Sequence, residues 1–145
     1  QAFDAVHLED QALAAVAPVA SRLQQVALRF DVGSAELPRR EARSFAEAAA
    51  ALLELAAIAR TAGLALDVDI VGHTDGSGSE GTNVRLSRAR AEWVLSALEA
   101  RGVRDLALSV TGVGASRPLR PEQTDVDKAQ NRSVTFHVRA PAGER

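Results

Sequence analysis

The sequence VGHTDGSGSEGTNVRLSRARA, residues 71–91, is the most informative stretch for the fold of this chain. It begins at the end of a segment that alternates apolar and polar residues, which predicts a strand. It then crosses a loop rich in glycine and serine and ends in a segment with helical spacing. Loops that lead from a strand end into a helix are common ligand sites in α/β folds. This loop matches neither GxxxxGK[ST] nor GxGxxG and contains no lysine, which argues against a nucleotide site.

Two residues of opposite charge flank the loop. Asp75 follows the strand, and Arg90 falls in the first turn of the next helix if Ser87 is its N-cap. Arg90 and the free N–H groups of a helix N-terminus can bind a carboxylate, while Asp75 can bind an ammonium. Together they suit a ligand that carries both charges on one carbon, such as the headgroup of a free amino acid. The alternative is a salt bridge between Asp75 and Arg90 that closes the loop.

Four segments of alternating apolar and polar residues predict four short strands. The apolar faces of these segments consist of Val26, Leu28 and Phe30; Leu66, Val68 and Ile70; Leu106, Leu108 and Val110; and Val134, Phe136 and Val138. The opposite face of each segment is largely polar, and it includes Asp67 and Asp69 on the second. Because strands covered on both faces are apolar throughout, we expect a sheet that is covered on one face only.

Two amphipathic segments predict the helices that cover the sheet. The first runs from about Pro38 to a stop at Gly63, and the second runs from about Ser87 to Arg101. Their inward-facing residues are Phe45, Leu52, Leu55 and Ala59 in the first and Trp93, Val94, Ala97 and Leu98 in the second. The expected fold is therefore an α/β two-layer sandwich with a β-α-β-α-β-β core, whose strand order the sequence leaves open.

The domain organisation follows from these elements. Residues 26–139 are interpreted as one domain, residues 1–25 as a lead-in segment from an upstream region, and residues 140–145 as a C-terminal tail. Apolar residues recur at helical spacing in the lead-in segment, where Pro18 is expected to kink or split a helix. No apolar run approaches the roughly 20 residues of a membrane span.

The composition narrows the classes of function. The chain has 145 residues, a net charge of −2, 3% aromatic residues and no cysteine. The lack of basic excess and of aromatic residues argues against a nucleic-acid partner. The lack of cysteine excludes disulfides, thiolate metal sites and a cysteine nucleophile. His7 and His137 show no metal-ligand spacing, and Asp125 and Asp127 are expected in a polar loop without an EF-hand pattern, so no metal or cofactor is predicted.

The catalytic candidate is His73, which lies close to Asp75 and Ser77 in sequence. A catalytic triad requires its three members within mutual hydrogen-bond reach, which neighbours on one loop rarely achieve. The nucleophile-elbow pattern GxSxG is also absent from the sequence. We therefore expect a protein that is not an enzyme, in which His73 packs or bonds at the strand end.

Several separated motifs point to one family. The pattern TD..G....N..LS..RA is matched by Thr74-Asp75, Gly78, Asn83, Leu86-Ser87 and Arg90-Ala91. Further matches in register are FDVGSAEL at residues 30–37, GVGASRP at residues 112–118 and NRSV at residues 131–134. On these motifs, residues 26–138 resemble the OmpA-like C-terminal domain, the peptidoglycan-binding module of the OmpA/Pal/MotB family of bacterial envelope proteins.

The resemblance implies a mixed sheet and recognition of the diaminopimelate residue in the stem peptide of peptidoglycan. Asp75 and Arg90 match the family residues that bind the ammonium and the carboxylate of diaminopimelate. The other candidate ligand contacts carried over by the motifs are Thr74, Asn83, Asn131 and Arg132. Ser133 stands where the family usually has a second arginine.

The sequence therefore predicts a noncatalytic domain that binds peptidoglycan in the periplasm. It would tether an envelope protein or the outer membrane to the cell wall, with any membrane anchor outside these residues. One alternative is an OmpA-like fold used for protein interaction or assembly without wall binding. A wall-cleaving enzyme is a second alternative, against which the missing catalytic constellation argues. The sequence leaves a homodimer open.

Overall fold

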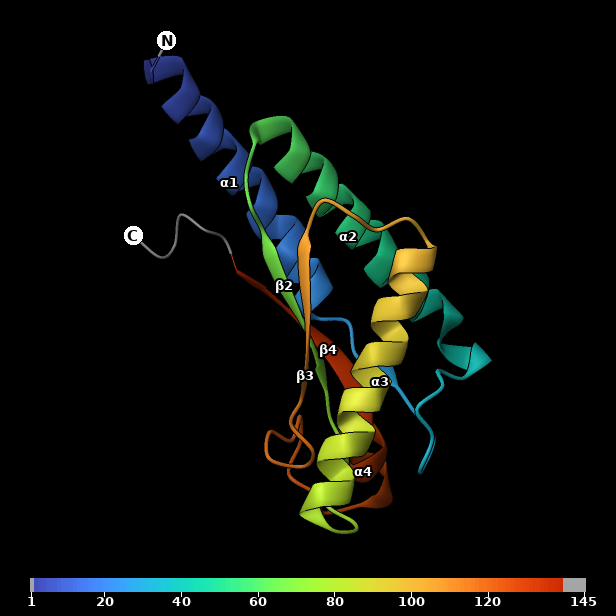
Figure 1. Cartoon of the computed structure of the whole chain (residues 1–145). Coiled ribbons are helices and arrows are strands. Elements are labelled where there is room, and N and C mark those ends of the chain that lie inside the picture. Colours follow the sequence, from blue (N-terminus) through green and yellow to red (C-terminus); the bar gives the residue numbers. More distant parts are fainter. Residues whose placement is uncertain (1, 140–145) are drawn as a thin grey trace.

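Four strands form one mixed sheet in the computed structural model, which describes residues 2–139, with side chains from residue 10 onward. The strands are β1 (Leu28–Arg29), β2 (Asp67–Gly72), β3 (Ala107–Gly112) and β4 (Ser133–Arg139). They lie in the order β1-β4-β2-β3, with β2 and β3 parallel and β4 antiparallel to both β1 and β2. This mixed sheet confirms the predicted α/β fold class (Figure 1).

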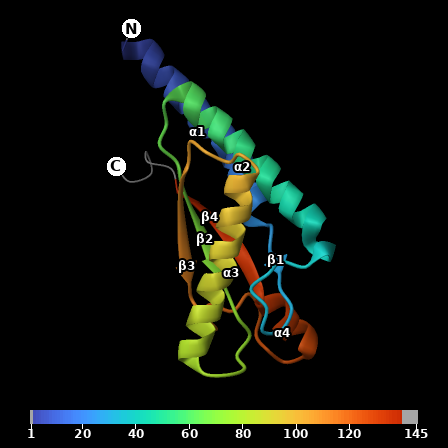
Figure 2. The same cartoon turned by 45° about the vertical axis from the view of Figure 1, so that its right-hand side comes forward.

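The helices are α1 (Ala2–Gln24), α2 (Ala42–Ala62), α3 (Glu80–Ala100) and α4 (Asp125–Asn131), and the short 3₁₀ helix η1 (Arg39–Glu41) precedes α2. Figures 1 and 2 show α1 running antiparallel to α2, and α3 lying along the strands. The predicted stripe of α2 is confirmed, because Phe45, Leu52, Leu55 and Ala59 are all buried in the core. On the second predicted helix, Val94 and Leu98 are buried, while Trp93 and Ala97 pack against the core at its margin.

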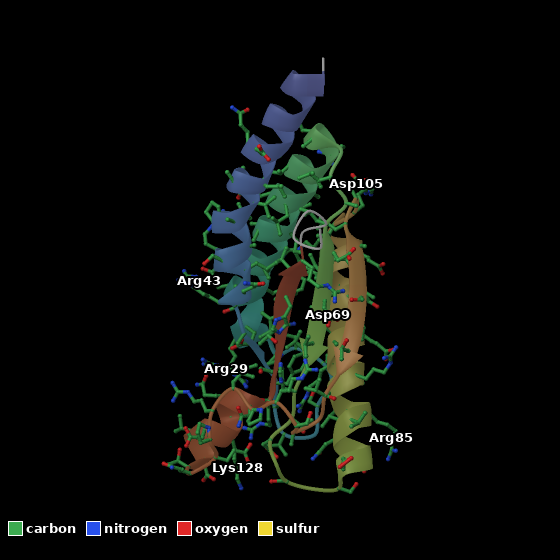
Figure 3. The ribbon with its side chains drawn as sticks, turned by 90° about the vertical axis from the view of Figure 1, so that its left-hand side faces the viewer. Arg29, Arg43, Asp69, Arg85, Asp105 and Lys128 are labelled. Atoms are coloured by element: carbon green, nitrogen blue, oxygen red, sulfur yellow. The ribbon has the colours of Figure 1, made fainter. Side chains whose placement is uncertain are left out.

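The sheet has one apolar and one polar face, as the alternation predicts. Val68 and Ile70 of β2 and Phe136 of β4 are buried beneath the helices. On the opposite face, the carboxylate of Asp69 accepts hydrogen bonds from the hydroxyls of Ser109 (3.1 Å) and Thr111 (2.9 Å). Asp69 is half-buried on this face and is labelled in Figure 3.

Helix α1 contributes to the same core. Val16, Val19 and Leu23 are buried in it, and the helix packs along α2 and beside β4. The helix continues without a break through Pro18, so the predicted split is wrong. Packing of the apolar stripe against α2 supplies most of the stability of such a helix and offsets the backbone hydrogen bond that proline removes. The predicted tail, residues 140–145, lies outside the described residues.

Two glycines allow α3 to approach the sheet closely. Gly72 and Gly112 are register partners at the ends of β2 and β3. A Cβ on Gly72 would lie 1.8 Å from the carbonyl oxygen of Ser87, and a Cβ on Gly112 would lie 2.5 Å from the amide nitrogen of Arg88. Both distances are too short for any side chain, so glycine at these positions sets how α3 crosses the strand ends.

Helix α3 begins earlier than the sequence suggests. Ser79 is its N-cap, since its hydroxyl accepts a hydrogen bond from the amide of Thr82 (3.3 Å). Ser87, the predicted N-cap, is instead a fully buried residue within the helix. Its hydroxyl donates to the Val84 carbonyl and accepts from the Gly114 amide (both 2.9 Å). The prediction failed because Gly81 suggested that the loop continued. A glycine within a helix lowers stability by only about 1 kcal/mol relative to alanine, so the helix can include it.

Candidate functional site

A pocket of about 490 Å³ opens beyond the carboxyl end of β2. It is lined by the loop after β2, the first half of α3, Val32 and Gly33 after β1, part of α4, and Arg132 between α4 and β4. Five of the six candidate ligand contacts line this pocket, namely Thr74, Asp75, Asn83, Arg90 and Arg132. Tertiary structure thus brings together residues that come from three separate parts of the chain.

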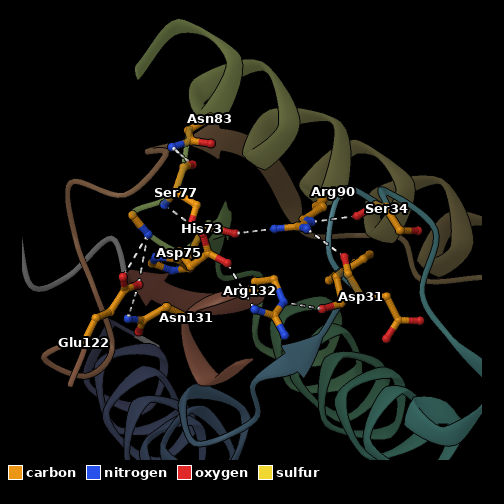
Figure 4. Close-up of polar contacts among 12 residues, drawn as sticks. Asp31, Ser34, His73, Asp75, Ser77, Asn83, Arg90, Glu122, Asn131 and Arg132 are labelled. Carbon is orange, nitrogen blue, oxygen red and sulfur yellow. Dashed lines mark hydrogen bonds and ion pairs between the residues drawn. The ribbon is translucent and has the colours of Figure 1, made fainter. Parts of the chain in front are cut away.

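The carboxylate of Asp75 forms an ion pair with Arg132 rather than with Arg90. The distance from Arg132 Nη1 to Asp75 Oδ2 is 3.0 Å, and the side chains of Arg132 and Asp75 are only 18% and 12% exposed. The other carboxylate oxygen accepts the backbone N–H of Ser77 at 2.9 Å (Figure 4). Burial alone would raise the pKa of Asp75, but the hydrogen bonds from Ser77 and Arg132 outweigh it and lower the pKa. Asp75 is therefore a carboxylate at neutral pH.

Arg90 is almost entirely buried and binds three backbone carbonyls. Its guanidinium donates from Nε to Ser34 O (2.8 Å), from Nη1 to His73 O (3.0 Å) and from Nη2 to Asp31 O (3.0 Å). Burial, together with the nearby charge of Arg132 and opposed by Asp75, lowers the pKa of Arg90 to about 10. Three of its five N–H groups are thus committed to the backbone, and two remain for the pocket that it lines.

The sequence placed Arg90 in the first helical turn, and this was wrong. Arg90 lies ten residues beyond Glu80, where α3 begins, which is about 15 Å along the helix. The free N–H groups of the helix N-terminus therefore cannot join Arg90 around one small carboxylate. The cation that lines the pocket together with Arg90 and lies close to it is Arg132.

Thr74 and Asn83 complete the lining in different ways. The hydroxyl of Thr74 is buried and has no hydrogen-bond partner among the described residues. The amide of Asn83 donates to the carbonyl of Ser77 at 3.0 Å and so holds the loop after β2 against α3. A buried hydroxyl without a partner is costly unless a ligand or a water molecule satisfies it. The hydroxyl of Thr74 can therefore bond a polar group of a ligand or a water molecule.

Asn131 does not line the pocket. It is fully buried at the end of α4, where its amide oxygen accepts from the backbone N–H groups of Leu119 and Arg120 (2.8 and 3.0 Å). Its amide nitrogen donates to Glu122 at 2.9 Å, and Glu122 in turn accepts the N–H of Gly76 at 3.0 Å. Sequence reasoning missed Glu122, which belongs to no motif. This chain of bonds ties the segment before α4 to the loop that carries Asp75.

Helix α4 was not predicted, and Asp125 and Asp127 belong to it rather than to a loop. The helix begins with a capping box, in which the hydroxyl of Thr124 accepts from the amide of Asp127 (3.2 Å) and the carboxylate of Asp127 accepts from the amide of Thr124 (3.1 Å). Seven residues are too few for hydrophobic periodicity to identify a helix.

His73 is committed to structure. Its Nδ1 lies 3.0 Å from the carbonyl oxygen of Arg117, and its Nε2 lies 2.9 Å from the hydroxyl of Thr135. Because a carbonyl only accepts, Nδ1 carries the proton and Nε2 accepts from Thr135. Burial lowers the pKa of His73, which favours this neutral form. Neither ring nitrogen is directed to Asp75 or Ser77, so these three residues form no catalytic triad.

Among the side chains that the structure describes, those of residues 10–139, no group of three His, Asp or Glu is placed to hold a metal ion. Between residues 2 and 139, no helix combines the length and the apolar character that crossing a membrane requires.

Comparison with known proteins identifies relatives. The model of the OmpA family matches residues 29–132. The chain is 40% identical over 80 residues to the outer-membrane lipoprotein YfiB of Pseudomonas aeruginosa, which covers 53% of this chain and 48% of YfiB. It is 42% identical over 71 residues to the peptidoglycan-binding protein ArfA of Mycobacterium bovis, which covers 49% of this chain and 22% of ArfA. The aligned part thus spans less than half the length of either relative.

A solved structure shares the fold. The peptidoglycan-associated lipoprotein from Burkholderia pseudomallei superposes with a TM-score of 0.66 at 23% sequence identity, and the match covers 79% of this chain and 91% of that one. At this level of identity, the likeness is one of fold.

Proposed function

The chain belongs to the OmpA family, and from this membership we propose that it is a noncatalytic domain that binds peptidoglycan through the diaminopimelate residue of the stem peptide. One observation carries the proposal above all others. Asp75, Arg90 and Arg132 meet at one pocket, where a carboxylate lies beside two guanidinium groups. The side-chain end of diaminopimelate carries an ammonium and a carboxylate on the same carbon, and these charges complement the pocket.

The charged groups of the pocket can bind this headgroup without losing their present partners. Each oxygen of Asp75 already accepts one hydrogen bond, which leaves lone pairs for a ligand ammonium. The two uncommitted N–H groups of Arg90 suit a ligand carboxylate, and the unpaired hydroxyl of Thr74 adds a donor or an acceptor. Arg132 is paired with Asp75 and adds a second positive charge near Arg90.

The named relatives support an envelope setting. ArfA is described as peptidoglycan-binding and YfiB as an outer-membrane lipoprotein. We infer that the domain works in the periplasm and tethers an envelope protein or the outer membrane to the cell wall. The anchor that such tethering requires would lie outside these residues. The commitment of His73 to Arg117 and Thr135 supports a binding role rather than a catalytic one.

Co-sedimentation with purified cell-wall sacculi tests the proposal. Lysine-type walls offer the ammonium without the carboxylate, so we expect pelleting with diaminopimelate-type sacculi and much less with lysine-type sacculi. Asp75→Asn should weaken binding roughly tenfold or more, since truncating one member of a buried charged pair costs several kcal/mol.

A matched control is Asp105→Asn. Asp105 also pairs with an arginine, Arg60 at 2.9 Å, but its side chain is 45% exposed. This variant should bind like the wild type. Equal pelleting with both wall types would refute recognition of diaminopimelate. Full binding by Asp75→Asn would show that the wall contact lies elsewhere, and absence of binding by the wild type would favour an interaction or assembly domain.

A further inference from the structure

The charged side chains that line the pocket do not balance. They are the carboxylates of Asp75 and Asp125 and the cations of Arg90, Lys128 and Arg132, which leaves one surplus positive charge. A headgroup with one ammonium and one carboxylate adds no net charge. With that headgroup bound, the side chains that line the pocket would still carry one net positive charge, which a second anionic group on the ligand would match.

Lys128 is the cation that is free to bind such a group. It is the one lysine in the sequence, and it lies half-buried on α4 at the pocket. No ion pair of Lys128 is found among the described residues, whereas Arg132 is paired with Asp75 and Arg90 is bound by three carbonyls. Asp125, three residues earlier on α4, lines the same pocket but forms no ion pair with Lys128 in the described part of the chain.

The other acidic neighbour of Lys128 is already engaged. The carboxylate of Asp127 accepts from the backbone N–H groups of Gln123 and Thr124 (3.0 and 3.1 Å) and lies 3.8 Å from Arg120. The capping box holds the start of α4, and the bonds of Asn131 hold its end. The helix therefore presents Lys128 from a fixed backbone, which lowers the entropic cost of forming an ion pair with a ligand.

We propose that Lys128 binds a second carboxylate of the wall peptide, namely the free α-carboxylate of the γ-linked D-glutamate that precedes diaminopimelate. This inference rests on the proposed function. With diaminopimelate in the pocket, the glutamate bonded to it in the stem peptide would lie at the rim of the pocket. The γ-linkage leaves the α-carboxylate of that glutamate free, and amidation of the carboxylate removes its charge. Lys128 would thus distinguish stem peptides by the amidation of their second residue.

The simpler role for Lys128 is to stabilise α4, because a cation in the last turn interacts favourably with the helix C-terminus. That role would change the stability of the protein but would leave its choice between ligands untouched. Discrimination between two ligands is therefore the decisive readout.

Titration calorimetry with two soluble peptides provides the test. The peptides are L-Ala-γ-D-Glu-diaminopimelate-D-Ala and the same peptide with the glutamate α-carboxylate amidated. We expect the wild type to bind the free acid roughly threefold to tenfold more tightly, as suits a partly exposed ion pair. Lys128→Gln should bind both peptides with the affinity that the wild type shows for the amide.

Arg104→Gln is the control for the loss of one positive charge. Arg104 is exposed, and its neighbour Asp105 is labelled in Figure 3 at the end of the molecule opposite Lys128. This variant should retain the wild-type preference for the free acid. Equal affinity of the wild type for both peptides, or an unchanged preference in Lys128→Gln, would overturn the role of Lys128 while the proposed function stands. Failure of the wild type to bind either peptide would overturn both.

A second measurement uses the single lysine as a probe and needs no substitution. Reductive methylation with ¹³C-formaldehyde keeps the charge of Lys128 and labels only this side chain and the N-terminal amine. The ¹³C resonance of Lys128 should shift on titration with the free-acid peptide and shift much less with the amide. Equal shifts with both peptides would contradict the proposal.

Discussion

Replacing Arg90 by lysine tests whether the hydrogen bonds of this arginine stabilise the fold. The guanidinium joins three segments: it donates to Asp31 and Ser34 in the loop after β1 and to His73 at the end of β2, while its own backbone belongs to α3. A lysine ammonium keeps the charge but cannot reproduce the planar fork that reaches three carbonyls at once. It can retain roughly one of the three bonds, so two carbonyls in a buried site lose their donor.

The expected loss of stability follows from these bonds. Hydrogen bonds to a charged group are worth about 1.5–3 kcal/mol each, so losing two should lower the free energy of unfolding by about 3–6 kcal/mol. The whole stability of a domain is roughly 5–15 kcal/mol, which makes this change a large fraction of the total. With an m-value of about 1.5–2 kcal/mol/M, the urea midpoint should fall by about 1.5 M or more.

Urea denaturation followed by tryptophan fluorescence measures the effect. Trp93, the one tryptophan in the sequence, lies on α3 against the core and reports on its packing. The matched control is Arg88→Lys on the same helix, because Arg88 pairs with Glu92 at 3.4 Å and both side chains are 56% exposed. This control should change the free energy of unfolding by no more than about 0.5 kcal/mol.

A wild-type midpoint for Arg90→Lys would refute this reasoning, since the three carbonyl bonds would then contribute nothing to stability. If the midpoint does fall, weakened wall binding in an Arg90 variant cannot by itself be assigned to a lost ligand contact. Asp75 makes one ion pair and one backbone hydrogen bond, so Asp75→Asn removes fewer contacts and is then the cleaner test of binding.

Gly72→Ala should unfold or severely destabilise the protein, because the new Cβ would overlap the Ser87 carbonyl. Gly81→Ala is the control: its Cβ would lie 3.6 Å from the Arg85 side chain, so stability should be unchanged or increased. Thermal denaturation of both variants measures the difference. Since hydrogen bonds lower the pKa of Asp75 in the folded protein, its contribution to stability should be complete above about pH 4 and be lost as the pH falls through the folded-state pKa. Asp75→Asn should therefore flatten the stability profile below about pH 4, and a profile parallel to the wild type would contradict the assignment. Since burial lowers the pKa of His73, the contribution of its neutral form to folding stability should be present above about pH 6.5 and be lost at lower pH. At neutral pH, ¹⁵N NMR should find the imidazole proton on Nδ1. A proton on Nε2 would contradict the hydrogen-bond assignment.

Local patterns in the sequence determined much of the fold and part of the site. Alternation predicted strands such as Leu66–Ile70 and an open polar face, because successive side chains of a strand point to opposite sides. Helical periodicity predicted the stripe of α2 and its end at Gly63, which adopts a left-handed conformation with φ of +67°. The family motifs predicted Asp75, Arg90 and Arg132 as members of one site, and all three line the pocket.

Only the tertiary structure decided how these residues are paired. Asp75 and Arg132 are 57 residues apart, and their ion pair depends on β4 lying next to β2. Arg90 binds carbonyls of the loop after β1, 56 and 59 residues away, because Gly72 and Gly112 let α3 approach the strand ends. Periodicity reports which face of an element is buried, but it carries no information about which segment lies opposite. The strand order, the partner of each buried charge and the position of Lys128 at the pocket are consequences of packing between distant segments.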